Sequence, residues 1–288
     1  MLLTAVLASS LLLNDSAFWS ELGARRALVC PPAQYSQCLT RIPAQYQQRF
    51  PQSSQVIRRQ LGLRAAMAMP INDQQFAGMI LWAPKRLTHS ISALWNDTVY
   101  QLPLAQQAEL TLWHELGHLE IAQLQQQGQL PRKLTPLEHE WLADSYMIWR
   151  SVRETGSLML AQQQLDRRNM AVFADIENLS HWTALYLAPQ FASFDVAQMQ
   201  QSDFSDWLLP LFQRTTRYNS DELQEFSGLL QRLFGMGRAQ SLPDYMSWRR
   251  PTLGQVVGAT LERVMGKTAA ETWMQQQNLR PDHTAAAQ

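Results

Sequence analysis

A short segment in the middle of the chain, His114-Glu115-Leu116-Gly117-His118, combines two imidazoles with a carboxylate. On an α-helix, positions i and i+4 lie one turn apart on the same face, so His114 and His118 can reach one metal ion. Zinc held in this way lowers the pKa of a bound water and polarises a carbonyl group, while a neighbouring carboxylate takes the proton. The segment therefore predicts a Zn²⁺ site with His114 and His118 as ligands and Glu115 as the catalytic base.

The sequence around this segment predicts the helix that such a site requires. Apolar residues recur at helical spacing from about Ala105 to Gln127, and Gly128 ends the pattern. The alternative is a helix that carries two surface histidines. The neighbouring Leu112, Trp113 and Leu119 instead predict a largely buried helix, and buried imidazoles need polar partners or a metal.

Catalytic zinc sites usually have a third protein ligand and one open position. A second helix is predicted from about residue 137 to 154, and Glu140 in it follows His118 by 22 positions, which leaves room for a loop and an antiparallel return. Asp144 lies four residues after Glu140, on the same helix face. It can accept the free N–H of a ligand imidazole and so fix its tautomer.

Two other residues of this helix compete for the place of third ligand. His139 would point about 100° away from Glu140 by helix geometry. Glu138 has Leu142, and no acid, four residues after it. The pairing with Asp144 therefore favours Glu140, with Glu138 and His139 as alternatives.

The His-Glu-x-x-His and Glu-x-x-Ala-Asp segments together resemble the gluzincin metallopeptidases, the group that contains the thermolysin, neprilysin and CAAX-prenyl-protease-like families. The likeness spans residues 90–146, about a fifth of the chain, and it includes a hairpin at 90–104 that looks like the substrate-binding edge strand of these enzymes. The metzincin pattern fails because Ile121 stands where a glycine is required. The resemblance implies a peptide or protein substrate and these roles: zinc ligands His114, His118 and Glu140, base Glu115, and Asp144 supporting His114.

Enzymes of this kind also place a downstream His, Tyr or Arg where it stabilises the oxyanion of the tetrahedral intermediate. His181 is the candidate, because it begins an aromatic-rich segment, Ser-His-Trp-Thr-Ala-Leu-Tyr-Leu. The alternative for His181 is a core or helix-capping histidine. Tyr146, Arg150 and Tyr186 remain alternatives for the role.

The N-terminal region points to export. Leu2–Leu13 is too short an apolar run to span a bilayer and resembles the core of a secretory signal, although the usual positively charged leader is missing. Residues 1–17 are therefore interpreted as a signal or an amphipathic first helix. Cys30 and Cys38, eight positions apart, suit a disulfide in an oxidising compartment, or else are two buried thiols. We expect a periplasmic or secreted protein, with the cytoplasm as the alternative.

The composition and length of the chain limit the classes of partner and the number of domains that we expect. The 288 residues contain 24 Lys plus Arg and 24 Asp plus Glu, so no basic excess indicates nucleic-acid binding. Membrane association is not indicated beyond the N-terminal segment, and no oligomeric state is predicted. The chain is long enough for a single domain from 18 to 288, with a catalytic core over 72–156 and a helical C-terminal subregion over 157–288.

The expected fold is α+β with helices predominating and a small antiparallel sheet packed on the active-site helix. Residues 18–69 are predicted to be helical with breaks at prolines, including a helix from Ser54 to Met69. A strand is predicted at 76–82 and a hairpin over 90–104, turning at Asn96-Asp97. From Leu158 onward the pattern is helical, with predicted breaks that include Pro210.

The leading hypothesis is a zinc-dependent metallopeptidase that hydrolyses peptide bonds. One rival is a metal-binding structural or regulatory protein with the same ligands and little or no turnover. Another is a helical protein that binds a membrane surface or a partner through the aromatic segments 206–212 and 245–250. Such aromatic clusters more often belong to a core.

Overall fold

The structure of the chain is a computed structural model that describes residues 16–235, 239–240 and 248–279. Residues 1–15, most of the segment interpreted as a signal or first helix, lie outside these ranges. The chain forms two compact units, each made of three stretches. Unit 1 comprises Met1–Thr88, Gln106–Thr135 and Leu142–Glu154, and unit 2 comprises His89–Ala105, Pro136–Trp141 and Thr155–Gln288.

Unit 1 is built on a four-stranded sheet with the order β1-β2-β4-β3. Its strands are β1 (Phe18–Leu22), β2 (Arg25–Cys30), β3 (Ala66–Pro70) and β4 (Phe76–Trp82). β2 and β4 run parallel, whereas the other two pairs are antiparallel. Every residue of β4 is buried, as expected for a central strand that is covered on both faces. The strand predicted at 76–82 is therefore confirmed.

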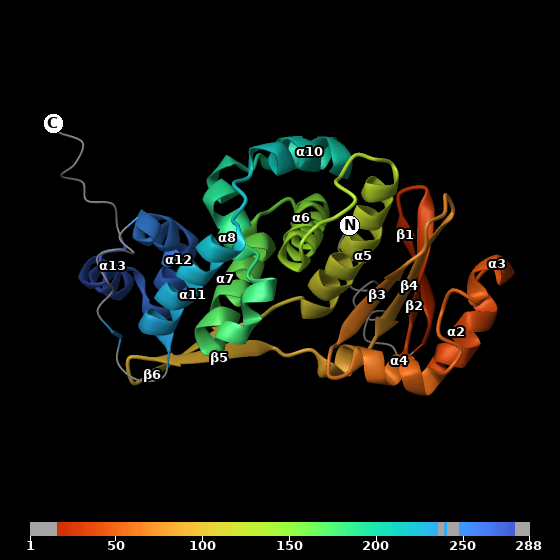
Figure 1. Cartoon of the computed structure of the whole chain (residues 1–288), viewed down its shortest axis with the longest axis horizontal. Helices are drawn as coiled ribbons and strands as arrows, with labels where there is room; N and C mark the ends of the chain where they lie inside the picture. Colours follow the sequence, from red (N-terminus) through yellow and green to blue (C-terminus); the bar gives the residue numbers. More distant parts are fainter. Residues whose placement is uncertain (1–15, 236–238, 241–247, 280–288) are drawn as a thin grey trace. The chain divides into compact units, whose positions relative to one another are not determined.

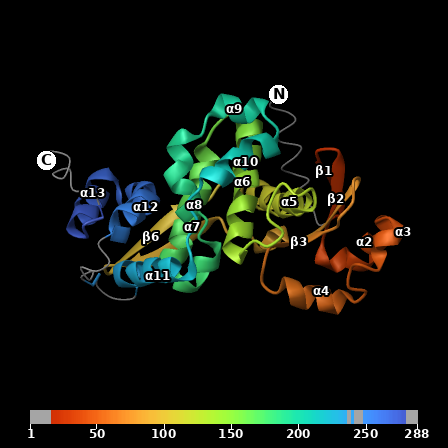
Figure 2. The ribbon, with the colours of Figure 1, turned by 45° about the horizontal axis from the view of Figure 1, so that its top comes forward.

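Helices cover the sheet of unit 1 on both faces. One side carries α2 (Tyr35–Arg41), α3 (Ala44–Gln47) and α4 (Ser54–Leu61), together with the short 3-10 helices η1 (Pro32–Gln34) and η2 (Pro84–Arg86). On the other side, α5 (Gln107–Gln126) packs on β3 and β4 (Figure 1, Figure 2). Sheet residues Leu28, Met79 and Leu81 form one buried cluster with Tyr35 and Ile57 of the covering helices.

The helical prediction for residues 18–69 is wrong in part, because β1, β2 and β3 lie there. β2 pairs with β1 beside it and with β4 about fifty residues later, and the local sequence pattern does not indicate the pairing with β4 that places β2 inside the sheet. The predicted helix from Ser54 to Met69 ends at Leu61, since Gly62 adopts a left-handed φ of 57° and stops it. The predicted antiparallel sheet is in fact mixed, because β2 and β4 are parallel.

The predicted disulfide between Cys30 and Cys38 is present, joining the end of β2 to α2, and both residues are fully buried. Replacing both cysteines with alanine is expected to lower the free energy of unfolding by about 2–3 kcal/mol, because the crosslink restricts the unfolded chain. Urea denaturation of the oxidised protein and of the double variant measures the difference. Equal midpoints and slopes for the two would contradict the expectation.

Unit 2 begins with a two-stranded hairpin, β5 (Ser90–Trp95) and β6 (Thr98–Pro103). The turn residues Asn96 and Asp97 have φ values of 53° and 60°, as the tight turn of a hairpin requires, so the predicted hairpin is confirmed. Trp95 is buried against Phe173 of α7 (Met159–Ala174) and Phe234 of α11 (Ser220–Phe234). The hairpin is thus anchored to the helices of its own unit.

The remainder of unit 2 is helical in its described residues, as predicted. Its helices are α7 (Met159–Ala174), α8 (Ala184–Leu187), α9 (Val196–Gln201), α10 (Phe204–Arg214), α11 (Ser220–Phe234), α12 (Arg250–Met265) and α13 (Lys267–Gln276), with η3 (Ile176–His181) and η4 (Ala188–Ser193) between them. Pro210 lies inside α10 and does not break it, so that predicted break is wrong. Helix α6 (Pro136–Thr155) belongs to both units, with its first turns in unit 2. The predicted class, a helix-dominated α+β fold, is confirmed.

Candidate metal centre

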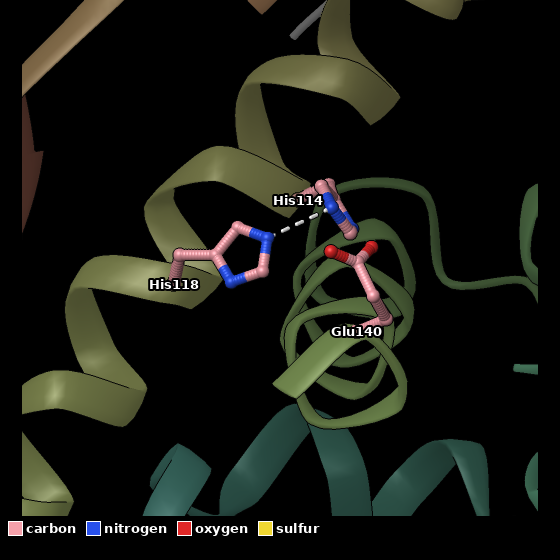
Figure 3. A group of neighbouring side chains, drawn as sticks. All are labelled: His114, His118 and Glu140. Atoms are coloured by element: carbon pink, nitrogen blue, oxygen red, sulfur yellow. Dashed lines mark hydrogen bonds between the residues drawn. The ribbon is translucent and has the colours of Figure 1, made fainter. Parts of the chain in front are cut away.

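The His-Glu-Leu-Gly-His segment lies in the interior of α5, as predicted. His114 and His118 are half-buried and one turn apart, and their Nε2 atoms lie 3.1 Å from each other. The two rings are nearly perpendicular, with an interplanar angle of 85°. The two Nε2 atoms therefore face each other at hydrogen-bond distance, as the dashed line in Figure 3 marks.

Asp144 determines which ring nitrogen of His114 carries the proton. Its side chain is fully buried, and its Oδ1 lies 2.7 Å from Nδ1 of His114. A carboxylate accepts, so Nδ1 of His114 donates its proton to Asp144, and Nε2 is the ring nitrogen that accepts the hydrogen bond from Nε2–H of His118. This is the arrangement in which an outer carboxylate orients a metal-ligating histidine. Asp144 thus lies where the sequence predicts it.

Glu140 supplies the third ligand atom of the group. One ligand atom from each of His114, His118 and Glu140 lies within 4.8 Å of the others. The carboxylate of Glu140 points from α6 toward the two imidazoles of α5 (Figure 3). Glu140 precedes Asp144 by four residues in the same helix, so the two carboxylates face α5 from successive turns.

The competing ligand candidates are placed differently. Oε1 of Glu138 lies 3.7 Å from Nε of Arg217, which directs that carboxylate to another partner. The geometric group contains neither Glu138 nor His139 among the residues described. The choice of Glu140 over its neighbours therefore agrees with the geometry.

The donor set fits zinc. Two imidazole nitrogens and one carboxylate oxygen are the ligands of known His₂Glu catalytic zinc sites. Zn–N bonds of about 2.0–2.1 Å in tetrahedral geometry place two ligand nitrogens roughly 3.3 Å apart, close to the 3.1 Å between the two Nε2 atoms. Two imidazole lone pairs at this distance repel each other unless a proton or a cation lies between them.

Gly117 allows the two helices of the site to approach each other. A Cβ atom at this position would lie 2.7 Å from the carbonyl oxygen of Ala143 and 3.0 Å from Cβ of Tyr146, both on α6. The backbone oxygen cannot move away without shifting α6. A glycine inside a buried helix is a sequence signal of close packing, and Gly117 is such a glycine.

Gly117→Ala is expected to destabilise the protein by about 1–3 kcal/mol, because the added methyl group forces α5 and α6 apart. Gly258→Ala is the matched control, since its Cβ would meet only the flexible Met274 side chain, at 3.6 Å. That variant is expected to gain about 0.5–1 kcal/mol from helix propensity. Thermal unfolding measures the melting temperature of both variants. Equal changes in the two melting temperatures would show that the contact of Gly117 with α6 is unimportant.

Glu115 lies between the two histidines in sequence and is 9% exposed. It is not a member of the group of ligand atoms that faces the candidate metal position. Its placement on α5 beside His114 agrees with the role of a base, which stays a prediction.

Two basic side chains flank Glu140 within unit 2. His181 ends η3, and its Nε2 lies 3.8 Å from Oε1 of Glu140. Nη2 of Arg168, on α7, lies 3.8 Å from Oε2 of the same carboxylate, and its side chain is 8% exposed. His181 is a residue that the sequence predicts for the site, whereas Arg168 could not be predicted, because no spacing relates it to the metal-binding segments.

The other candidates for stabilising an oxyanion have contacts of their own. Tyr146 packs against Trp149, and burial raises the pKa of its hydroxyl above the ordinary value. Arg150 pairs with Glu154 at 2.7 Å. Tyr186 stacks on Trp141, and burial raises its pKa to about 12. His181, by contrast, lies with its Nε2 3.8 Å from Oε1 of Glu140.

The structure describes all of one aromatic segment and part of the other that would support binding to a membrane surface or a partner. In the segment 206–212, Trp207, Leu208, Leu211 and Phe212 are buried, so they belong to the core. In the segment 245–250, residues 245–247 lie outside the described residues, and Trp248 is 54% exposed. The described helices include none that is both long and apolar enough to cross a membrane.

Comparison with known proteins assigns neither a family nor a function to the chain. No family model matches the chain, and no curated protein or solved structure was found to be similar to it. The candidate centre is therefore defined by the chemistry and geometry of its own residues.

Proposed function

We propose that this protein is a zinc-dependent metallopeptidase. The observation that carries the proposal is the convergence of His114, His118 and Glu140, with Asp144 behind the first imidazole. These residues combine the ligand set of a catalytic zinc with the outer carboxylate that such sites use. The adjacent Glu115 supplies the carboxylate that hydrolysis needs.

Each residue has a defined part in the proposed reaction. Zinc, when bound, polarises the carbonyl of the peptide bond and acidifies water. Glu115 accepts a proton from the attacking water and delivers it to the leaving amine. His181 donates a hydrogen bond to the oxygen on which negative charge develops. Arg168, beside Glu140, offsets part of the negative charge of that carboxylate and limits its rotation.

A binding protein that holds zinc through the same three residues is the second candidate function. Glu115 argues against it, because a structural site needs no carboxylate beside its ligands and is normally closed by a fourth protein ligand. The described residues contain a group of three ligands, which matches a centre with one open position.

The proposal is tested by metal analysis and turnover on the purified full chain. We expect about one zinc per chain and cleavage of casein or a denatured protein that a chelator abolishes and added zinc restores. Added magnesium is the control, since it prefers oxygen ligands and is expected not to restore cleavage. Stoichiometric zinc without cleavage of any substrate would favour the binding protein, and absence of zinc would reject both functions.

A further inference from the structure

The turn that follows α4 presents a leucine to solvent. Leu63 is 96% exposed, whereas Leu61, two residues earlier, is 1% exposed and packs in the core of unit 1. Gly62 between them adopts a left-handed φ of 57°, which reverses the chain and points the next side chain outward. Single exposed leucines are common on protein surfaces, so the fixed conformation and the surroundings of Leu63 decide whether it has a role.

Two arginines hold this turn. Nη1 of Arg86 donates to the carbonyl oxygens of Gly62 at 2.6 Å and of Arg64 at 3.0 Å, the residues on either side of Leu63. The side chain of Arg64 donates back to the carbonyl oxygens of Leu61, at 3.3 Å, and of Gln60. The backbone around Leu63 is therefore fixed in the conformation that displays it, and a binding partner would not have to order it.

The surroundings of the leucine are cationic. We call Leu63 and the exposed basic side chains on α4, on η2 and in the turn between α4 and β3 the Leu63 surface; its basic members are Arg58, Arg59, Arg64, Lys85 and Arg86. The segment from residue 58 to 86, which carries this surface, contains five Lys and Arg residues and a single acidic residue, Asp73. That carboxylate accepts a hydrogen bond from Tyr46. The chain as a whole is neutral, so positive charge is concentrated in this segment.

We propose that the Leu63 surface docks on membranes that contain anionic phospholipids. Basic side chains near a surface gain about 1 kcal/mol each from anionic headgroups, and an apolar side chain that protrudes among them can enter the boundary with the acyl chains. Nucleic acid would satisfy the arginines but give the leucine no apolar environment, whereas a lipid surface satisfies both. The proposal goes beyond the peptidase function and does not depend on it.

Co-sedimentation of the full chain with lipid vesicles tests the proposal. We expect binding to vesicles of phosphatidylcholine mixed with phosphatidylglycerol, weak binding to phosphatidylcholine alone, and loss of binding at high salt. Leu63→Ser is expected to weaken binding about tenfold or more, because the serine cannot bury apolar area. The double variant Arg58→Gln/Arg59→Gln is expected to weaken it roughly 30-fold, from two lost headgroup attractions.

Leu94→Ser is the matched control, because Leu94 is also exposed, at 49%, but lies on the hairpin of unit 2. It is expected to bind vesicles like the unaltered chain. Failure of the unaltered chain to sediment with the anionic vesicles would overturn the proposal. So would equal binding by Leu63→Ser and the unaltered chain, which would assign the vesicle binding to another part of the protein. Binding to a labelled DNA or RNA duplex without vesicle binding would assign the arginines to nucleic acid.

Discussion

Glu115→Gln is expected to keep zinc and the native fold while losing peptidase activity by about 10²–10⁴-fold, the usual contribution of general acid–base catalysis. Glutamine preserves the shape of this nearly buried side chain and can still form hydrogen bonds, but it cannot accept a proton at neutral pH. Both proton transfers proposed for Glu115 are therefore lost together. Steady-state cleavage by the zinc-loaded variant, with metal content measured on the same sample, gives the result.

Glu109→Gln is the matched control for this variant, because Glu109 lies on the same helix, in its first turn. It is expected to retain cleavage close to that of the unaltered chain. If Glu115→Gln loses its zinc, Glu115 is a ligand or a folding element. Unchanged turnover by the metal-loaded variant would reject the proposed mechanism and favour the binding protein.

Glu140→Gln is expected to weaken zinc retention by more than the 10–100-fold typical of losing an outer partner of a metal ligand, because it removes a ligand itself. A neutral amide oxygen is a poorer donor to Zn²⁺ than a carboxylate. Glu138→Gln, two residues away, removes the same charge from the same helix but is expected to leave zinc retention unchanged. Competition with a chromogenic chelator measures the affinities of both variants.

The comparison of Glu140→Gln with Glu138→Gln distinguishes coordination of the metal by Glu140 from a general effect of negative charge on α6. Equal losses in the two variants would mean that the negative charge of α6, rather than coordination by Glu140, holds the metal. The reverse order would assign the third ligand to Glu138, whose carboxylate lies 3.7 Å from Arg217 in the structure.

Features that depend on neighbouring residues were correctly predicted from the sequence. The spacing of His114 and His118 on one helix face follows from the helical repeat alone. Asn96 and Asp97 tolerate the left-handed conformation of a hairpin turn, and β4 is a short apolar run bounded by polar residues and proline. The disulfide was predictable from the short spacing of its cysteines.

Features that depend on distant pairing were not predictable in the same way. The sequence predicts helix for β1, β2 and β3. In the structure β1 and β3 pair with their neighbours β2 and β4, and the pairing of β2 with β4, about fifty residues apart, joins the two pairs into one sheet. The sequence predicts Leu63 as one apolar position of a helix from Ser54 to Met69. Its exposure follows from the stop at Gly62 and from the hydrogen bonds of Arg86, which lies 22 or more positions farther along.

The sequence by itself determined that two imidazoles and a carboxylate lie together on one helix. His114, Glu115 and His118 fall within a little more than one helical turn, so the helical repeat alone brings them together. Only the tertiary structure decided what surrounds them. The group formed with Glu140, the fit of Gly117 against α6, and the approach of Arg168 and His181 to Glu140 join residues that are 22 or more positions apart. Such contacts are set by the packing of whole helices, so no local pattern in the chain records them.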